Sequence, residues 1–248
     1  MSYTNSSLVS YTKISPNRTS PRNHVIDTIT IHCMAGNLSV EGCGNVFAPT
    51  ARQASSNYGI GSDGRIALYV NESDRSWCSS DRANDHRAVT IEVANDGGAP
   101  DWHVSDKAMS SLIELVADIC KRNHIRKLVW SADKNDRINH LNGCNMTVHR
   151  DFAAKACPGN YLYGMHQYIA DEVNKKLGND TTSGAYQVKL LEDLNIRKTP
   201  NGTIVKVNGA KKGVIYTIVE TKGCWGRLKS GAGWISVSDK YVRKVSSH

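Results

Sequence analysis

His149-Arg-Asp-Phe-Ala-Ala-Lys-Ala-Cys157-Pro158-Gly159 is the stretch that decides how this 248-residue chain is interpreted. It sets two side chains that can bind a metal, His149 and Cys157, just before a Pro-Gly break. Because the ring of Pro158 disrupts a continuing helix, a loop or strand end suits the two ligands better than one helix face. Far upstream, His32 ends an apolar, strand-like run. Two imidazoles and one thiolate can hold zinc and leave its fourth position to water, so the pattern indicates a zinc hydrolase.

Strand-like and helix-like segments alternate through the first 177 residues. Strands are expected at 26–31 and 89–93, and a hairpin over 58–70, where Ser-Asp-Gly supplies a tight turn. Apolar residues at three- and four-residue spacing predict one helix from Ser105 to about His124 and a second after Pro158. The polar, irregular segment 130–143 is expected to be a loop near the metal. The pattern predicts an α/β domain, 1–177, with a mixed central sheet flanked by helices.

The composition changes at residues 178–185, which have no periodicity and consist of turn-forming residues. This segment is predicted to be a linker. After it, short strand-like runs separated by turns predict a small all-β barrel over 186–248. Residues 185–248 carry 12 Lys and Arg against 4 Asp and Glu, whereas the rest of the chain is balanced at 19 against 19. Such an excess indicates contact with a polyanion, which could be nucleic acid, an anionic membrane or an anionic wall polymer. The alternative is that the excess only aids solubility.

Several protein classes are disfavoured by what the sequence contains. Its seven cysteines form no C-x-x-C pair and are odd in number, which argues against a secreted disulfide scaffold. No stretch approaches the roughly 18 apolar residues of a membrane-spanning helix. The N-terminus has neither the basic start nor the apolar core of a secretory signal, so we expect synthesis in the cytoplasm without a signal peptide.

Over residues 24–177 the chain resembles the type 2 N-acetylmuramoyl-L-alanine amidases, which include phage endolysins, bacterial autolysins and peptidoglycan recognition proteins. Four segments carry this resemblance. They are the first zinc strand Thr28-Ile-Thr-Ile-His32, the hairpin 56–64, Trp77 with the central strand 88–95, and the closing zinc loop 149–159. The last is the most specific of the four.

The resemblance implies both a ligand set and a reaction. It implies that His32, His149 and Cys157 bind Zn²⁺, and that water activated by the metal cleaves the amide bond between N-acetylmuramic acid and L-alanine in peptidoglycan. Tyr58 and Lys155 match positions that assist catalysis in some phage amidases, and Glu92 matches a catalytic acidic position in other members. Trp77 and Asn95 are the expected substrate contacts. One departure is Cys78, which follows Trp77 where many members have a histidine, and it puts the groove contacts in doubt.

The C-terminal region resembles a bacterial SH3-like cell-wall-binding domain. Its candidate wall-binding residues are aromatic, although core packing is the stronger alternative for at least two of them: Tyr216, Trp225, Trp234 and Tyr241. The expected partners are therefore peptidoglycan and, through the basic surface, anionic wall polymers, with no nucleic acid and no stable membrane insertion.

The function expected from the sequence is that of a phage or prophage endolysin, which is made in the host cytoplasm and reaches the wall after the membrane is permeabilised or lysed. A bacterial autolysin with the same chemistry is one alternative. A second alternative is a non-catalytic, receptor-like peptidoglycan-binding protein, against which the intact ligand set argues. A third, a nucleic-acid-binding protein, would account for the basic C-terminal region but would leave the spacing of His and Cys unexplained.

Overall fold

The computed structural model describes residues 3–178, 185–222 and 224–245, and the chain divides near residue 180 into two compact units. The predicted linker, 178–185, falls almost wholly on residues 179–184, which lie outside the described part, so the domain limits 1–177 and 186–248 stay predictions. Among the described helices, none is both long and apolar enough to cross a membrane.

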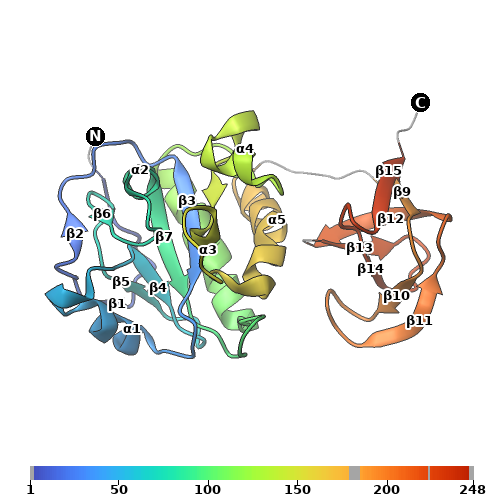
Figure 1. The fold of residues 1–248 in the computed structure, drawn as a ribbon, viewed down its shortest axis with the longest axis horizontal. Helices are drawn as coiled ribbons and strands as arrows, with labels where there is room; N and C mark the ends of the chain where they lie inside the picture. The colour runs from blue at the N-terminus through green and yellow to red at the C-terminus, as the bar shows by residue number, and fades with distance from the viewer. Residues whose placement is uncertain (1–2, 179–184, 223, 246–248) are drawn as a thin grey trace. The chain divides into compact units, whose positions relative to one another are not determined.

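The first unit is built on a mixed six-stranded sheet with the strand order β1-β5-β4-β7-β3-β8 (Figure 1). Strands β4, β7, β3 and β8 run parallel, whereas β5 is antiparallel to β4. The bounds are β1 Tyr11–Thr12, β3 Thr28–Cys33, β4 Tyr58–Ile60, β5 Ile66–Leu68, β7 Ala88–Val93 and β8 Met146–Thr147. A separate two-stranded pair joins β2 Arg18–Thr19 to β6 Arg75–Ser76. The predicted mixed central sheet and hairpin are therefore present.

Helices flank this sheet, as expected for an α/β domain. They are α1 Val40–Phe47, α2 Arg82–Arg87, α3 Asp106–Arg122, α4 Lys134–Ile138 and α5 Gly159–Lys176, together with the single turns η1 Thr50–Arg52, η2 Leu141–Gly143 and η3 His149–Asp151. The Ser105 side chain caps α3 by accepting the Ala108 N–H, as the sequence predicts. The expectation of an irregular loop over 130–143 is wrong in part, because α4 forms there.

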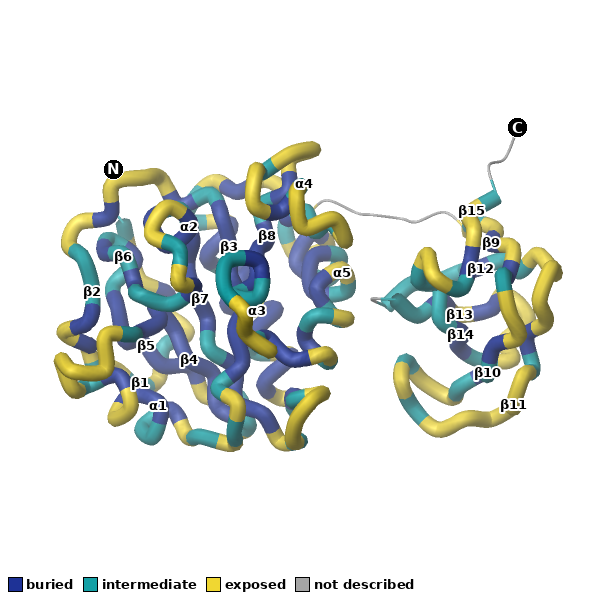
Figure 2. Tube along the Cα trace, in the orientation of Figure 1, coloured by how far each residue is buried: buried dark blue, intermediate teal, exposed yellow. Residues whose placement is uncertain are grey.

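Strands β3 and β7 alternate apolar and polar residues, and this gives the centre of the sheet two different faces. Ile31 pairs in register with Ile91 on one face, and His32 pairs with Glu92 on the other. Every residue of β3 is buried, and every residue of β7 except the partly buried Glu92 (Figure 2). On the polar face the Thr30 hydroxyl forms a hydrogen bond with the Thr147 hydroxyl of the neighbouring strand β8. The sheet therefore has a polar face on which His32 and Glu92 lie side by side, each one residue before its strand ends.

The second unit is a separate seven-stranded, all-β sheet with the order β11-β10-β14-β13-β12-β9-β15. Its strands are β9 Tyr186–Leu190, β10 Leu194–Arg197, β11 Ile204–Ala210, β12 Ile215–Lys222, β13 Trp225–Leu228, β14 Trp234–Ser236 and β15 Val242–Val245. A compact apolar core holds it together: Val188, Leu190, Leu194, Ile196, Ala210, Ile218, Leu228, Ile235 and Val242. Strand β11, at one edge of the sheet, is largely exposed (Figure 2).

Candidate metal centre

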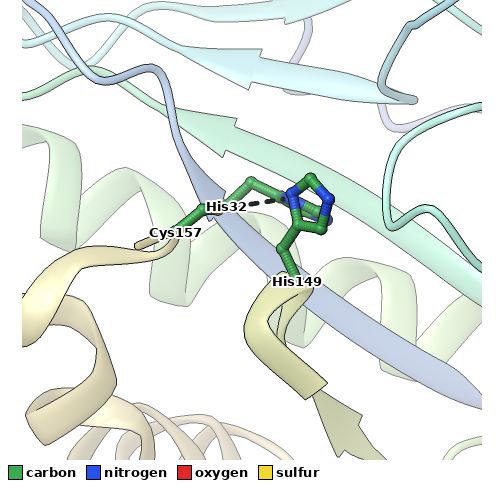
Figure 3. A group of neighbouring side chains, drawn as sticks. All are labelled: His32, His149 and Cys157. Carbon is green, nitrogen blue, oxygen red and sulfur yellow. Dashed lines mark hydrogen bonds between the residues drawn. The ribbon is translucent and has the colours of Figure 1, made fainter. Parts of the chain in front are cut away.

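Three side chains that are far apart in the sequence meet beside the polar face of the sheet. His32 comes from β3, His149 opens η3, and Cys157 lies in the loop that leads into α5 (Figure 3). One potential ligand atom from each lies within 4.8 Å of the other two. The Cys157 Sγ atom is 3.4 Å from Nδ1 of His32, and the centroids of the two imidazole rings are 5.2 Å apart. The structure thus brings together the three residues predicted to bind metal.

This donor set fits zinc. With Zn–N and Zn–S bonds of about 2.0 and 2.3 Å, a nitrogen and a sulfur on one tetrahedral zinc lie about 3.5 Å apart. The observed 3.4 Å between Nδ1 of His32 and Sγ of Cys157 matches that separation. In His149 the Nε2 atom is 2.9 Å from the Ser80 hydroxyl, which leaves Nδ1 free to act as the ligand. Each ring therefore has an Nδ1 atom available for the same ion.

The closing loop is held in shape by Arg150, the residue after His149. Its guanidinium donates to the carbonyl oxygen of Cys157 over 3.3 Å and to that of Ala156, and it lies over the Tyr163 ring of α5 at 4.6 Å. These contacts turn the chain back on itself, so that Cys157 returns toward His149. The backbone N–H of Cys33 also points at Sγ of Cys157, at 3.5 Å.

A buried ion pair fixes the turn that carries His149. Asp151 accepts the backbone N–H of Val148 at 3.1 Å and two hydrogen bonds from Arg137, at 2.6 and 2.9 Å. Both charged side chains are almost fully buried. Since a buried carboxylate is tolerated only when it is paired and hydrogen-bonded, this arrangement leaves η3 little freedom to move.

The helix α5 begins two residues after Cys157, and Gly159 makes this possible. Its φ is +83°, and a Cβ atom there would lie 2.7 Å from the Trp102 side chain. Only glycine adopts this conformation without strain and leaves room for Trp102. This sharp turn places Cys157, the third potential ligand, next to the N-terminus of α5.

Both imidazoles are held in the neutral form that a metal requires. Burial, and then His149 and His166, lower the pKa of His32 well below its ordinary value. The pKa of His149 is lowered by burial and by the nearby charge of Lys155. The hydrogen bond with the Cys33 thiol and burial raise the pKa of Cys157, so that this residue is a thiol in the metal-free chain. A metal ion bound there would have to displace the thiol proton.

Glu92 lies next to His32 and forms a second group with Cys78. Ligand atoms of His32, Cys78 and Glu92 also lie within 4.8 Å of one another, and Sγ of Cys78 is 4.0 Å from the Glu92 carboxylate. Within the described residues, Oε2 of Glu92 and Nε2 of His32 are buried without a hydrogen-bond partner. Burial, with a smaller effect of Cys33, raises the pKa of Glu92 to about 8. A carboxyl group that can hold a proton at neutral pH therefore lies beside the three ligands.

Lys155 and Tyr58, both predicted to assist catalysis, have very different positions. Lys155 is exposed in the closing loop, and its charge acts on His149. Tyr58 is fully buried and pairs with Ile91, on the opposite sheet face from Glu92. Its hydroxyl donates to Glu72 at 2.6 Å and accepts the Ser6 N–H at 2.9 Å. The structure does not bring Tyr58 to the cluster, because strand alternation turns its side chain away.

The two expected substrate contacts also differ from each other. Trp77 is partly exposed, directly precedes Cys78 and donates from its indole N–H to the Thr19 hydroxyl at 3.0 Å. Asn95 is buried, and its side-chain N–H donates to the carbonyl oxygen of Trp102 at 2.8 Å. Trp77 thus lies next to Cys78 of the group around Glu92, whereas Asn95 holds a neighbouring loop.

In the second unit, three of the four candidate wall-binding aromatics take part in packing. Trp234 is buried, and Tyr216 and Tyr241 are partly buried against the apolar core. Trp225 is partly exposed, and the Arg197 guanidinium lies 5.4 Å from its ring centroid. Of the four, Trp225 is the partly exposed one that does not pack against this apolar core.

Comparison with known proteins connects this centre to a chemistry. The family model described as N-acetylmuramoyl-L-alanine amidase matches residues 22–160. No match to the sequence is found among curated proteins. Among solved structures, the Staphylococcus aureus hydrolase AmiA in complex with its ligand is similar, with a TM-score of 0.50 and 18% identity over 69% of this chain and 85% of that chain.

Two further solved structures are similar at the same level. A mutant of PlyL gives a TM-score of 0.49 at 13% identity, covering 66% of this chain and 96% of its own. A selenomethionine derivative of AmpD gives a TM-score of 0.48 at 18% identity, covering 65% of this chain and 94% of its own. At such identities the likeness concerns the fold.

Proposed function

The chain belongs to the N-acetylmuramoyl-L-alanine amidase family, and from that premise we propose that it is a zinc-dependent hydrolase of peptidoglycan. The bond cleaved is the amide between N-acetylmuramic acid and the L-alanine of the stem peptide. The observation that supports this proposal best is the convergence of His32, His149 and Cys157 beside Glu92.

The three ligands and the metal have separate tasks. A zinc ion bound there would polarise the amide carbonyl and lower the pKa of a water molecule toward about 7. His32 and His149 supply neutral nitrogen donors, because burial disfavours their protonation. Cys157 contributes a sulfur ligand whose position is fixed by the Arg150 contacts.

Glu92 is the proton carrier in this proposal. Its carboxyl group is adjacent to His32, and in the metal-free chain burial raises its pKa to about 8. In its ionised form it can take a proton from the attacking water and deliver it to the amine nitrogen as the amide bond breaks, a role typically worth 10²–10⁴-fold in rate. Lys155, exposed in the closing loop, supplies a positive charge that stabilises negative charge on the carbonyl oxygen. Tyr58 takes no direct part in this scheme.

The second unit, in this proposal, anchors the enzyme to its insoluble substrate. Residues 185–248 hold all of the excess positive charge, which suits anionic wall polymers, and Trp225 with Arg197 offers a partly exposed aromatic and cationic surface. We propose an SH3-like wall-binding role for this unit and an endolysin role for the whole chain, acting at the wall after the membrane is permeabilised.

The test is an end-group analysis of purified cell wall after digestion. We expect new L-alanine amino groups and one zinc per wild-type chain, and we expect Cys157→Ala to lose both zinc and activity. New reducing sugars would instead indicate a glycosidase. Wall binding without any released ends would indicate the non-catalytic receptor, and full activity of metal-free Cys157→Ala would refute the ligand assignment.

A further inference from the structure

We infer that Ser80 is a positioning residue for His149, whose hydroxyl sets the imidazole so that Nδ1 faces the metal. This inference rests on the proposed zinc site and goes beyond it, because the resemblance assigns Ser80 no role. The observation behind it is the 2.9 Å contact between Oγ of Ser80 and Nε2 of His149.

This contact determines which ring nitrogen is available. A neutral imidazole has one N–H donor and one lone pair, and the partner of one nitrogen decides the state of the other. When Nε2 of His149 donates its proton to the Ser80 hydroxyl, the lone pair resides on Nδ1. His32 also presents Nδ1 to the cluster, at 3.4 Å from Cys157. Ser80 thus makes His149 bind through the same nitrogen as its partner ligand.

The backbone at Ser80 is itself unusual. Its φ is +64°, in the left-handed region that glycine adopts most easily. A non-glycine residue in this region is uncommon and leads to a hypothesis of function when its side chain makes a specific contact. Here the side chain contacts a metal-ligand candidate.

The loop that carries Ser80 is anchored from behind by Asp85. This buried carboxylate accepts the backbone N–H groups of Cys78 and Ser79, at 3.0 and 3.1 Å, and the Ser79 hydroxyl at 2.5 Å. Three hydrogen bonds to one carboxylate hold the two residues before Ser80 in place, which limits where its hydroxyl can lie.

Asn84 ties the same loop to the strands that carry the ligands. Its amide donates to the Ser79 hydroxyl at 3.0 Å and to the Thr30 hydroxyl at 3.1 Å, and it accepts from the Thr147 hydroxyl at 2.9 Å. Thr30 and Thr147 each precede a histidine ligand by two residues. Loop 78–80 and the two strands therefore form one hydrogen-bonded framework around the site.

The experiment uses two substitutions in the full-length chain, Ser80→Gly and Ser80→Asn. Glycine relieves the backbone strain but removes the hydroxyl, so we expect the melting temperature of the metal-free protein to stay the same or rise. The affinity of Ser80→Gly for Co²⁺, measured by chelator competition and by the visible absorption of the bound ion, should be about tenfold lower than that of the wild type. Asparagine tolerates positive φ and offers a carbonyl oxygen to Nε2–H, so it should restore most of the affinity.

Asn142→Gly is the matched control, because Asn142 is exposed, has a φ of +53° and lies in the single turn η2. It should leave the Co²⁺ affinity unchanged. Equal Co²⁺ affinity and an equal spectrum in wild type and Ser80→Gly would overturn the role of Ser80. An equal loss of Co²⁺ affinity in Ser80→Gly and Ser80→Asn would overturn it as well. Neither result would contradict the proposed zinc site. Failure of the wild-type chain to bind Co²⁺ or Zn²⁺ would instead overturn the proposed metal site and this inference together.

Discussion

Glu92 and Tyr58 lie one register position apart on the neighbouring strands β7 and β4, yet their side chains are on opposite faces of the sheet. The residue opposite Glu92 is Gly59, and Tyr58 pairs with Ile91. Glu92 reaches the cluster, whereas the Tyr58 hydroxyl is used in a buried hydrogen bond with Glu72, which itself pairs with Arg122 at 2.6 Å. The two residues should therefore respond differently to substitution.

For Glu92→Gln we expect activity on a soluble muropeptide to fall by about 10²-fold or more, because an amide cannot carry the proton. Zinc should remain at one per chain.

For Tyr58→Phe we expect activity within a few-fold of wild type but a loss of roughly 1–3 kcal/mol in the free energy of unfolding, since the buried Glu72 loses a hydrogen bond. Steady-state kinetics, metal analysis and denaturant unfolding give these quantities. A collapse of catalysis in Tyr58→Phe with unchanged stability would contradict this assignment.

The site could be predicted from the sequence only where residue type carries the chemistry. Histidine and cysteine before a Pro-Gly break signal a metal, so His149 and Cys157 stand out. Serine is common in loops, and nothing in Trp77-Cys-Ser-Ser80 signals that its last hydroxyl lies 2.9 Å from a ring nitrogen. The sheet face on which Tyr58 lies could not be predicted either: the motif gives its position along the strand, but the face is set by register with β7.

At the scale of elements, alternation and apolar spacing predict most of the first unit. The runs around Thr28 and Val89 form strands, and the stripe beginning at Met109 is the buried face of α3. The helix α4 could not be predicted in this way, because its buried residue is the charged Arg137, which pairs with Asp151. A buried ion pair leaves no hydrophobic periodicity to detect.

The helix α5 likewise carries a buried polar residue that apolar spacing does not reveal. His166 is fully buried, with its ring centroid 4.3 Å from that of Trp130 and its Nδ1 atom 2.6 Å from the Leu162 carbonyl oxygen. Burial lowers the pKa of His166 to about 4. The packing of α5 should therefore depend on pH.

The direction in which pH changes the stability depends on whether the folded or the unfolded chain binds the proton of His166 more readily. In the unfolded chain His166 titrates near its ordinary pKa of 6.5, whereas in the folded chain it stays neutral down to about 4. The unfolded state thus binds more protons between these values, so the stabilisation is complete above pH 6.5 and is lost as the pH falls toward 4. With 1.36 kcal/mol per pKa unit, the loss is about 3 kcal/mol.

We expect His166→Gln to flatten this part of the pH dependence, because glutamine cannot become charged in this range. The measurement is urea unfolding of both proteins between pH 7.5 and 4.5, with a chelator present so that metal binding does not contribute. The exposed His24→Gln serves as the control and should leave the slope as it is in the wild type. Identical slopes for wild type and His166→Gln would show that the buried ring does not set this dependence.

At the scale of the whole molecule, charge and chemistry are divided between the two units. The polar sheet face and the metal-ligand candidates belong to the first unit, in a region of balanced charge, whereas the second unit holds the positive excess. The all-β character of the second unit could be predicted from its strand-like runs. Which of its aromatics belong to the core could not be predicted, because core and surface aromatics look alike in the sequence. Packing buries Trp234 and leaves Trp225 partly exposed.

This division predicts what removal of residues 185–248 does. The remaining chain should bind one zinc and hydrolyse a soluble muropeptide at a rate close to that of the full-length protein, because every proposed catalytic residue lies in the first unit. Lysis of whole cells should weaken by about tenfold or more at low salt, since a tethered wall binder raises the effective concentration of enzyme at the wall, often to millimolar levels.

The advantage of the full-length protein should shrink as salt rises, because its attraction to anionic polymers is screened over about 10 Å at 0.1 M ionic strength. Turbidity assays over a salt series measure this difference. Trp225→Ala in the full-length chain is the matched variant: it should reduce wall binding while leaving turnover of the soluble substrate intact. Equal lytic rates for the truncated and full-length chains at every salt concentration would mean that the basic unit plays no part in targeting.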